Sequence, residues 1–290
     1  MFIILGYLIV AAGVFVSFVA MGGHMGALYQ PFEFTLIGGA ALGAYIASSN
    51  GASIKLLLEA VPKAIKRNPY GKSLYMELMA LLYVLLNKAR RDGLMSIESD
   101  IEDPKASAIF TQYPLVQQDA KIMEFLTDYL RIMISGNMNS FEIETLMDQE
   151  IEALHNEHHS PVNAVRAVAD GLPAFGIVAA VLGVVKALAA VDQPPAVLAD
   201  LISKAMVGTF LGILLSYGFC APFASAVERQ SVASIKVLEC IKVTLLASMN
   251  GYPPPLAVEF GRKVLFSSVR PSFSELEAHV RQAKNQAASR

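Results

Sequence analysis

The chain has 290 residues, of which 54% are apolar and only 17% are charged, and its formal net charge is −2. Soluble globular proteins carry about 25% charged residues, and the small net charge, without a dense basic stretch, excludes nucleic acid as an expected partner. The sequence contains no nucleotide-binding loop, nucleophile–base arrangement or complete metal-ligand set. It therefore predicts neither an enzyme nor a resident cofactor or metal.

Four apolar segments approach the length of about 20 residues that a helix needs to cross a bilayer. Charge is almost absent from them, since Glu33 is the only formal charge in residues 1–54 and residues 205–227 carry none. Lys186 lies near one end of the third segment, where a long side chain can reach the membrane surface. The predicted spans are about Phe2–Met21, Phe34–Ser49, Leu172–Val191 and Lys204–Val227.

The distribution of Lys and Arg predicts the orientation of these spans, because cytoplasmic connections are enriched in both residues. The connections 22–33 and 192–200 contain none, whereas residues 51–169 contain twelve and residues 228–290 contain nine. We therefore expect both termini and both long segments in the cytoplasm, with two short loops on the other side.

The predicted fold class is an all-α integral membrane protein with four transmembrane helices and a large helical cytoplasmic domain. Periodic apolar residues predict helices in the cytoplasmic segments as well. The predicted domains are 1–50 (spans one and two), 51–169 (cytoplasmic helical domain), 170–227 (spans three and four) and 228–290 (C-terminal cytoplasmic helical region).

Several cytoplasmic helices have recognisable bounds. Asn139 with Glu142 has the spacing of a capping box that opens a helix over 140–159, and Ser272 with Glu275 opens another over 273–285. Ser160 followed by Pro161 suits the start of a separate helix that leads into the third span. The other predicted helices are a buried one at Leu74–Lys88, an amphipathic one at Ala120–Ser135, and one at Glu228–Asn250.

Glycine pairs in the third and fourth spans predict close approach of the helix backbones. They are Gly176 with Gly183 and Gly208 with Gly212. None of the spans has a central carboxylate, although proteins that move ions across membranes usually carry one there. If an ion crosses here, its titrating group comes from a partner and this chain supplies the walls; otherwise no ion crosses.

Polar residues and prolines in the last two spans allow two interpretations each. The hydroxyls of Thr209, Ser216 and Tyr217 in the fourth span are expected to bond within their own helix, with the alternative that Thr209 faces a pore. Pro173 and Pro222 mark the cytoplasmic ends of the spans, either as boundaries or as hinges. Pro222 cannot donate to the carbonyl of Gly218, so a kink is expected there.

Charged residues of the predicted cytoplasmic domain also allow two interpretations. A basic block around Arg90 is followed by acidic residues that include Glu98, a pattern suited to docking on a charged surface or to a solvated helix end. His155, His158 and His159 share one helix face, but no fourth ligand converges on them. We therefore interpret the histidines as a solvated face.

Seven strings spread along almost the whole chain match a known pattern: Gly26–Pro31, Leu172–Ala180, Ala205–Leu215, Val243–Leu246, Asn250–Tyr252, Ala257–Lys263 and Arg270–Phe273. Together they resemble the MotA family of flagellar motor stator proteins. The resemblance covers residues 1 to about 285 and agrees with the predicted topology.

The resemblance implies a multi-pass protein of the bacterial inner membrane. Its partners are a peptidoglycan-anchored MotB subunit that supplies the ion-binding Asp, the rotor switch protein FliG, membrane lipid and further copies of the chain. These copies are expected as a pentamer around a MotB dimer. The resemblance further implies rotor-contact charges at Arg90 and Glu98 and coupling prolines at Pro173 and Pro222.

The implied pore-facing residues are Ala180, Thr209 and Tyr217. Sodium-driven members of the family tend to place hydroxyl residues in both pore-facing spans, whereas this chain has Ala180 in the third. The expected ion is therefore the proton. The alternatives are an energy transducer of the ExbB/TolQ type, which generally has three spans, and a membrane scaffold that conducts nothing.

Overall fold

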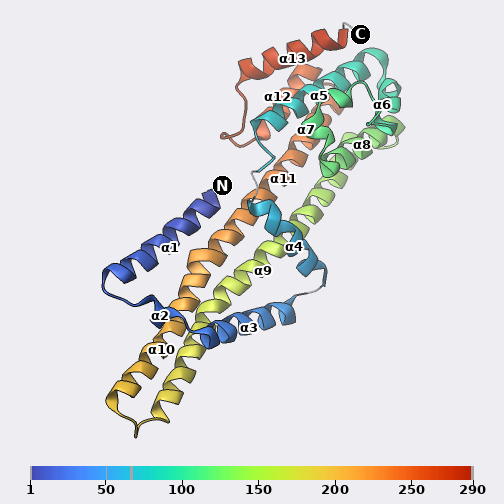
Figure 1. Cartoon of the computed structure of the whole chain (residues 1–290). Coiled ribbons are helices and arrows are strands. Elements are labelled where there is room, and N and C mark those ends of the chain that lie inside the picture. Colours follow the sequence, from blue (N-terminus) through green and yellow to red (C-terminus); the bar gives the residue numbers. More distant parts are fainter. Residues whose placement is uncertain (1, 50, 66–67, 289–290) are drawn as a thin grey trace. The chain divides into compact units, whose positions relative to one another are not determined.

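The computed structural model describes residues 2–49, 51–65 and 68–288, and these residues are helical with turns between them and no strand. Figure 1 labels the helices. The predicted domain boundary at Asn50 lies outside the described residues. The chain divides into a first unit of Met1–Arg67 with Glu157–Gln230, and a second unit of Asn68–Asn156 with Ser231–Arg290.

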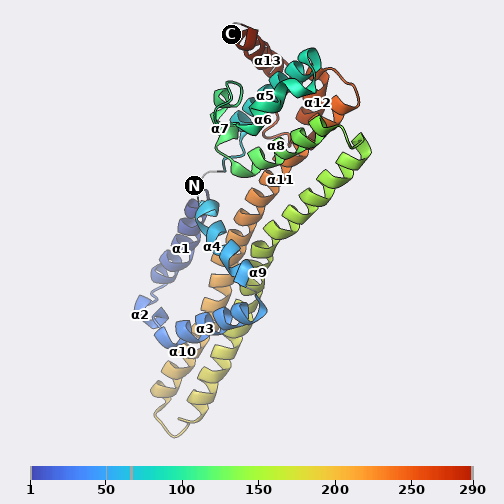
Figure 2. The ribbon, with the colours of Figure 1, turned by 90° about the vertical axis from the view of Figure 1, so that its right-hand side faces the viewer.

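The first unit contains most of the apolar helices. In Figures 1 and 2, α10 runs beside the C-terminal part of α9 in both views. Its helices are α1 (Phe2–Ala20), α2 (Met25–Leu28), α3 (Pro31–Ser48), α4 (Gly51–Ile65), α10 (Pro195–Ile213) and the π-helix η3 (Leu214–Cys220), with parts of α9 (Ser140–Leu188) and α11 (Ala221–Met249).

Three helices of the described residues are long and apolar enough to cross a membrane, at Ile3–Ala20, Ser140–Leu188 and Pro195–Met249. They correspond to the predicted first, third and fourth spans, although the predicted first span extends one residue beyond Ile3–Ala20 at each end and the predicted third span extends to Val191, beyond Leu188. The predicted second span corresponds to α3, which is not among the three. Its 18 residues begin with Pro31 and include Glu33, and these two residues lower the mean hydropathy of the helix.

The predicted loops on the far side of the membrane are shorter in the structure. Residues 22–33 contain α2 and the first turn of α3, so Glu33 lies in a helix rather than in a loop. Residues 195–200 likewise belong to α10. In both cases the helix begins with a proline. Proline suits the first helical position, because an N–H there would have no partner within the helix.

The predicted helix start at Ser160 is wrong. The helix α9 has 49 residues, Ser140–Leu188, and continues through Pro161 without a break. An internal proline removes one helical hydrogen bond and destabilises a helix by about 3 kcal/mol. Pro161 is buried, and the neighbouring Val162 and Val165 are buried as well. We infer that burial of this apolar face outweighs the lost hydrogen bond.

The second unit is built around α5 (Lys72–Asp92), whose apolar side chains are buried nearly all round, as predicted for residues 74–88. Its core includes Tyr75, Leu82 and Phe125. The other helices are η1 (Leu94–Ile97), α6 (Glu98–Glu102), η2 (Phe110–Gln112), α7 (Pro114–Gln117), α8 (Ala120–Ser135), α12 (Pro254–Val264) and α13 (Phe273–Ala288), with parts of α9 and α11.

Both predicted capping boxes are confirmed. The Asn139 side chain accepts a hydrogen bond from the Glu142 N–H, and the Glu142 carboxylate accepts one from the Asn139 N–H. Ser272 and Glu275 make the same reciprocal pair at α13. Lys72 of α5 also donates to Glu275 at 2.8 Å, and these hydrogen bonds lower the pKa of that carboxyl to about 2.

Candidate functional site

Glycines bring α9 and α10 together at backbone contact. A Cβ added to Gly176 would lie 2.8 Å from the carbonyl oxygen of Gly208, and one added to Gly212 would lie 2.6 Å from that of Leu172. One added to Gly183 would lie 2.5 Å from a side chain of α10. The predicted close approach is confirmed, because no side chain fits between the helices at these positions.

Two of the predicted pore-facing residues lie along this glycine seam. A Cβ on Gly208 would be 3.4 Å from the backbone nitrogen of Ala180, and one on Gly176 would be 3.4 Å from the Cα of Thr209. The structure therefore brings Ala180 and Thr209 onto facing segments of α9 and α10. Tyr217 lies further along, in η3, with 64% of its surface exposed.

Glu33 was not among the predicted site residues. Its Oε2 atom is buried and has no hydrogen-bond partner among the described residues. A Cβ on Gly208 would lie 2.8 Å from this oxygen, so the glycine leaves room for the carboxylate beside the seam. The signal was present in the sequence, because Glu33 is the only formal charge in residues 1–54.

The two predicted coupling prolines have different local structures. Pro173 lies inside α9 and is partly buried. Pro222 is exposed and comes two residues after the π-helix η3. Where a kink was predicted, the structure has a π-helical turn, which is wider than a turn of α-helix. There the N–H of Ala221 donates to the carbonyl of Ser216, five residues back. Such π-helical turns are frequent at functional sites.

Arg90 and Glu98 belong to the second unit, apart from the other predicted site residues. Arg90 is in the last turn of α5 and Glu98 is the first residue of α6, with η1 between them. The connection turns at Gly93, whose φ of 89° is strained for other residues. Both charges are exposed, and neither has an ion-pair partner among the described residues.

The charges around Arg90 and Glu98 are already paired. Lys88 of α5 donates to Asp100 of α6 at 2.7 Å, and Ser107 donates to the same carboxylate at 2.6 Å. Asp100 is 8% exposed. Hydrogen bonds from Arg91 to Asp92 lower the pKa of that exposed carboxyl. The network attaches α6 to α5 and leaves Arg90 and Glu98 available to a partner.

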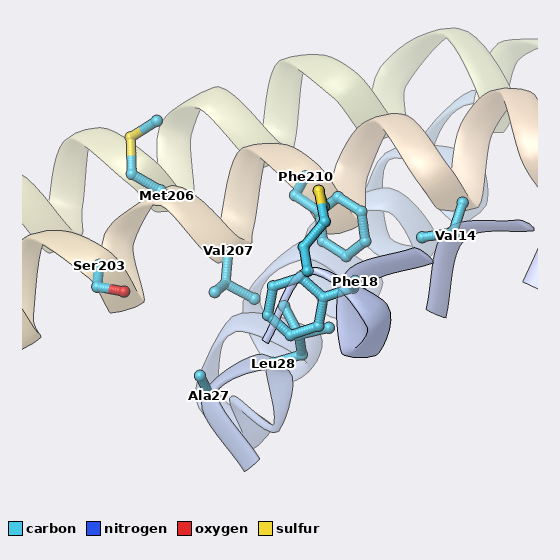
Figure 3. A pocket seen from close by; sticks show the side chains of 9 residues that line it. Val14, Phe18, Ala27, Leu28, Ser203, Met206, Val207 and Phe210 are labelled. Atoms are coloured by element: carbon cyan, nitrogen blue, oxygen red, sulfur yellow. The ribbon is translucent and has the colours of Figure 1, made fainter. Parts of the chain in front are cut away.

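An apolar groove of about 420 Å³ lies between α1, α2 and α10. Figure 3 shows the aromatic rings of Phe18 and Phe210 in it, with Ser203 at one end. Among the described side chains that line it, none is charged.

Among the described residues, no three His, Cys, Asp or Glu side chains are placed to hold a metal ion. The candidate site therefore has two parts. The first unit contains the tight, largely apolar pair of α9 and α10, and the second unit contains the exposed charges of Arg90 and Glu98.

Comparison with known proteins identifies the family. A model for the N-terminal part of motility protein A matches residues 4–93, and a model of the MotA/TolQ/ExbB proton channel family matches residues 117–240. Motility protein A of Salmonella typhimurium is 56% identical over 285 residues, covering 98% of this chain and 97% of the relative. The chain belongs to the motility protein A family. This membership confirms the resemblance of the seven strings.

Solved structures of motility protein A complexes share the fold. A chain of the C. jejuni MotAB structure matches with a TM-score of 0.76 and 21% identity, covering 93% of this chain and 98% of that one. A chain of the flagellar MotAB stator complex from Bacillus subtilis matches with a TM-score of 0.70 and 23% identity, covering 95% and 96%. Motility protein A is a membrane protein of a proton channel family and is not an enzyme.

Proposed function

We propose that this chain is a stator subunit of the bacterial flagellar motor that forms a proton-conducting channel with MotB and converts ion flow into torque. The main support for this proposal is the 56% identity with Salmonella motility protein A along nearly the whole length of both chains. The N-terminal family model is specific to motility protein A. It favours the motor over an ExbB/TolQ-type transducer or a scaffold.

The proposed topology has four spans in the inner membrane, with both termini in the cytoplasm. The second span is α3, whose 18 residues extend about 27 Å at 1.5 Å per residue, close to the roughly 30 Å of a bilayer core. Within Ile3–Ala20 of α1 no residue is buried, and the side chains are exposed or partly exposed. Membrane lipid and neighbouring copies, arranged as a pentamer around a MotB dimer, would cover this surface.

In the proposed mechanism, a MotB Asp takes up protons beside Ala180 and Thr209. The wall formed by α9 and α10 is tight and largely apolar, and the buried carboxylate oxygen beside it belongs to Glu33 in the first turn of α3. The predicted spans themselves have no carboxylate at their centre, which supports a titrating group supplied by the partner. Protonation removes the charge of that Asp and changes its preferred position against α9 and α10. Pro173 and Pro222 would transmit the change to the cytoplasmic helices.

The proton is the proposed ion because Ala180 offers no hydroxyl at the seam. The test is swimming of a strain that lacks its own A subunit and carries this chain with a matched MotB. We expect swimming without sodium and its arrest by a proton uncoupler. Swimming that requires sodium would overturn the choice of ion alone, whereas no swimming despite membrane insertion and MotB binding would overturn the stator function.

The proposed rotor partner is FliG, contacted through Arg90 and Glu98. Reversing either charge is expected to lower torque about fivefold or more, because these exposed groups would meet like charge across the interface. An opposite reversal on the rotor should restore part of the torque, as measured on tethered cells. Lys105→Glu is the matched control, since Lys105 is exposed in the same unit and should keep near-normal torque. Equal rescue by an uncharged rotor residue would contradict charge pairing.

A further inference from the structure

The carbonyl of Ala169 in α9 lacks the donor that it would have in a regular helix. In an α-helix the carbonyl of residue i accepts the N–H of residue i+4, and the residue four positions after Ala169 is Pro173, which has no N–H. Ala169 is 2% exposed, so water does not readily replace the missing donor. A buried carbonyl of this kind needs another partner.

The partner comes from the other side of the seam. The hydroxyl of Ser216 donates to the carbonyl of Ala169 at 2.5 Å, across 47 residues of sequence. Ser216 is completely buried. A serine in a membrane helix commonly bonds a carbonyl one turn back in its own helix, but here it bonds the neighbouring helix. Ser216 thereby satisfies the group that Pro173 leaves unpaired.

Ser216 also belongs to the irregular turn before Pro222. It lies within η3, and its own carbonyl accepts the N–H of Ala221, the residue directly before that proline. One residue therefore joins both irregularities: its hydroxyl contacts the helix at Pro173, and its carbonyl takes part in the π-helical turn at Pro222.

The glycine seam makes this contact possible. Gly212 lies one turn before Ser216, and a Cβ there would be 2.6 Å from the carbonyl oxygen of Leu172 and 2.9 Å from the Cα of Gly176. The helices can come this close only because glycine, which has no side chain, occupies these positions. A short serine can then reach the α9 backbone directly.

A second polar contact joins the same two helical runs beyond the prolines. Arg166 of α9 donates to Glu228 of α11 at 2.5 Å. Both side chains are partly exposed, so this ion pair contributes little by itself. The buried Ser216 hydroxyl is the contact that lies at the level of the irregular turns.

We propose that the Ser216 hydroxyl is a positioning group that couples the two prolines. It holds the α9 backbone at Pro173 and the π-helical turn before Pro222 in one arrangement, so that movement at either turn is transmitted to the other. This role rests on the proposed stator function. The hydrogen bond itself does not, and the two can be tested separately.

The hydrogen bond is tested with a double-mutant cycle on the purified complex of this chain with MotB. Ser216→Ala should lower the Tm by about 3–6 °C, because a buried carbonyl loses its donor. In a Pro173→Ala background, residue 173 regains an N–H for the carbonyl of Ala169. The same Ser216→Ala change should then lower the Tm by less than about 1 °C.

Ser203→Ala is the matched control, since it removes an exposed hydroxyl from α10 and should leave the Tm unchanged in both backgrounds. An equal loss of Tm from Ser216→Ala in both backgrounds would overturn the proposal, because the hydroxyl would then act independently of Pro173.

The coupling role is tested by swimming in the strain without its own A subunit. Ser216→Ala should reduce the swimming rate at least about twofold, while the amounts of chain in the membrane and of bound MotB stay normal. Normal swimming together with the background-dependent loss of Tm would overturn the coupling role and keep the hydrogen bond. Failure of the unmodified chain to support swimming would overturn the stator function, and the coupling role with it.

Discussion

Replacing Pro222 by Ala is expected to abolish swimming while the chain still inserts in the membrane and binds MotB. Alanine restores an N–H that can bond the carbonyl of Gly218, and it removes the roughly 3 kcal/mol by which an internal proline disfavours a regular helix. The π-helical turn at Leu214–Cys220 should then tighten to an α-helix. We expect the swimming rate in soft agar to fall at least about tenfold.

Pro62→Ala is the matched control for this experiment. Pro62 is also exposed and inside a helix, α4, but it is not next to η3 or to the glycine seam. This variant should swim normally. Normal swimming of the Pro222→Ala variant, with normal amounts of chain in the membrane, would contradict a role of this turn in torque transmission.

Replacing Gly212 by Ala is expected to separate α9 from α10 and to destabilise the complex with MotB by about 3 kcal/mol. The added Cβ would meet backbone atoms of Leu172 and Gly176 at 2.6 and 2.9 Å, and backbone atoms cannot move aside by changing a rotamer. Thermal unfolding of the purified complex should show a markedly lower Tm. Swimming should be lost with it, because Ala180 and Thr209 lie on the same seam.

The control for Gly212→Ala is Gly171→Ala, which adds the same methyl group to α9. There the new Cβ would meet the ring of Phe175 at 3.4 Å, and alanine favours a helix over glycine by about 1 kcal/mol. The control complex should be as stable as the unmodified one or slightly more so. An unchanged Tm of the Gly212→Ala complex would contradict the close approach of the two backbones.

Local sequence patterns predicted much of the helical structure. The buried face of α5, the bounds of α8 and the capping boxes at Asn139 and Ser272 all agree with the structure. Each depends on residues within a few turns of one another, so composition and spacing are sufficient. The same local reasoning placed a helix start at Ser160, where burial around Pro161 keeps α9 continuous.

The candidate site was only partly predictable. Thr209, Ala180 and the two prolines were named from sequence and from the family resemblance. The seam along which Ala180 and Thr209 lie depends on glycines from two helices, since Ala180 is next to Gly208 and Thr209 is next to Gly176. The burial of one Glu33 oxygen beside Gly208 was not predicted, because it depends on where α3 meets α10.

The sequence by itself determined the class of this protein: apolar segments with almost no charge, a one-sided distribution of Lys and Arg, and strings typical of motility protein A. Only the tertiary structure decided that Ser216 bonds the carbonyl of Ala169, and that Arg90 and Glu98 lack ion-pair partners among the described residues while their neighbours are paired. The physical reason is distance along the chain. Periodicity reports contacts within one helix, whereas these features depend on atoms from different helices and on which polar groups remain unpaired after packing.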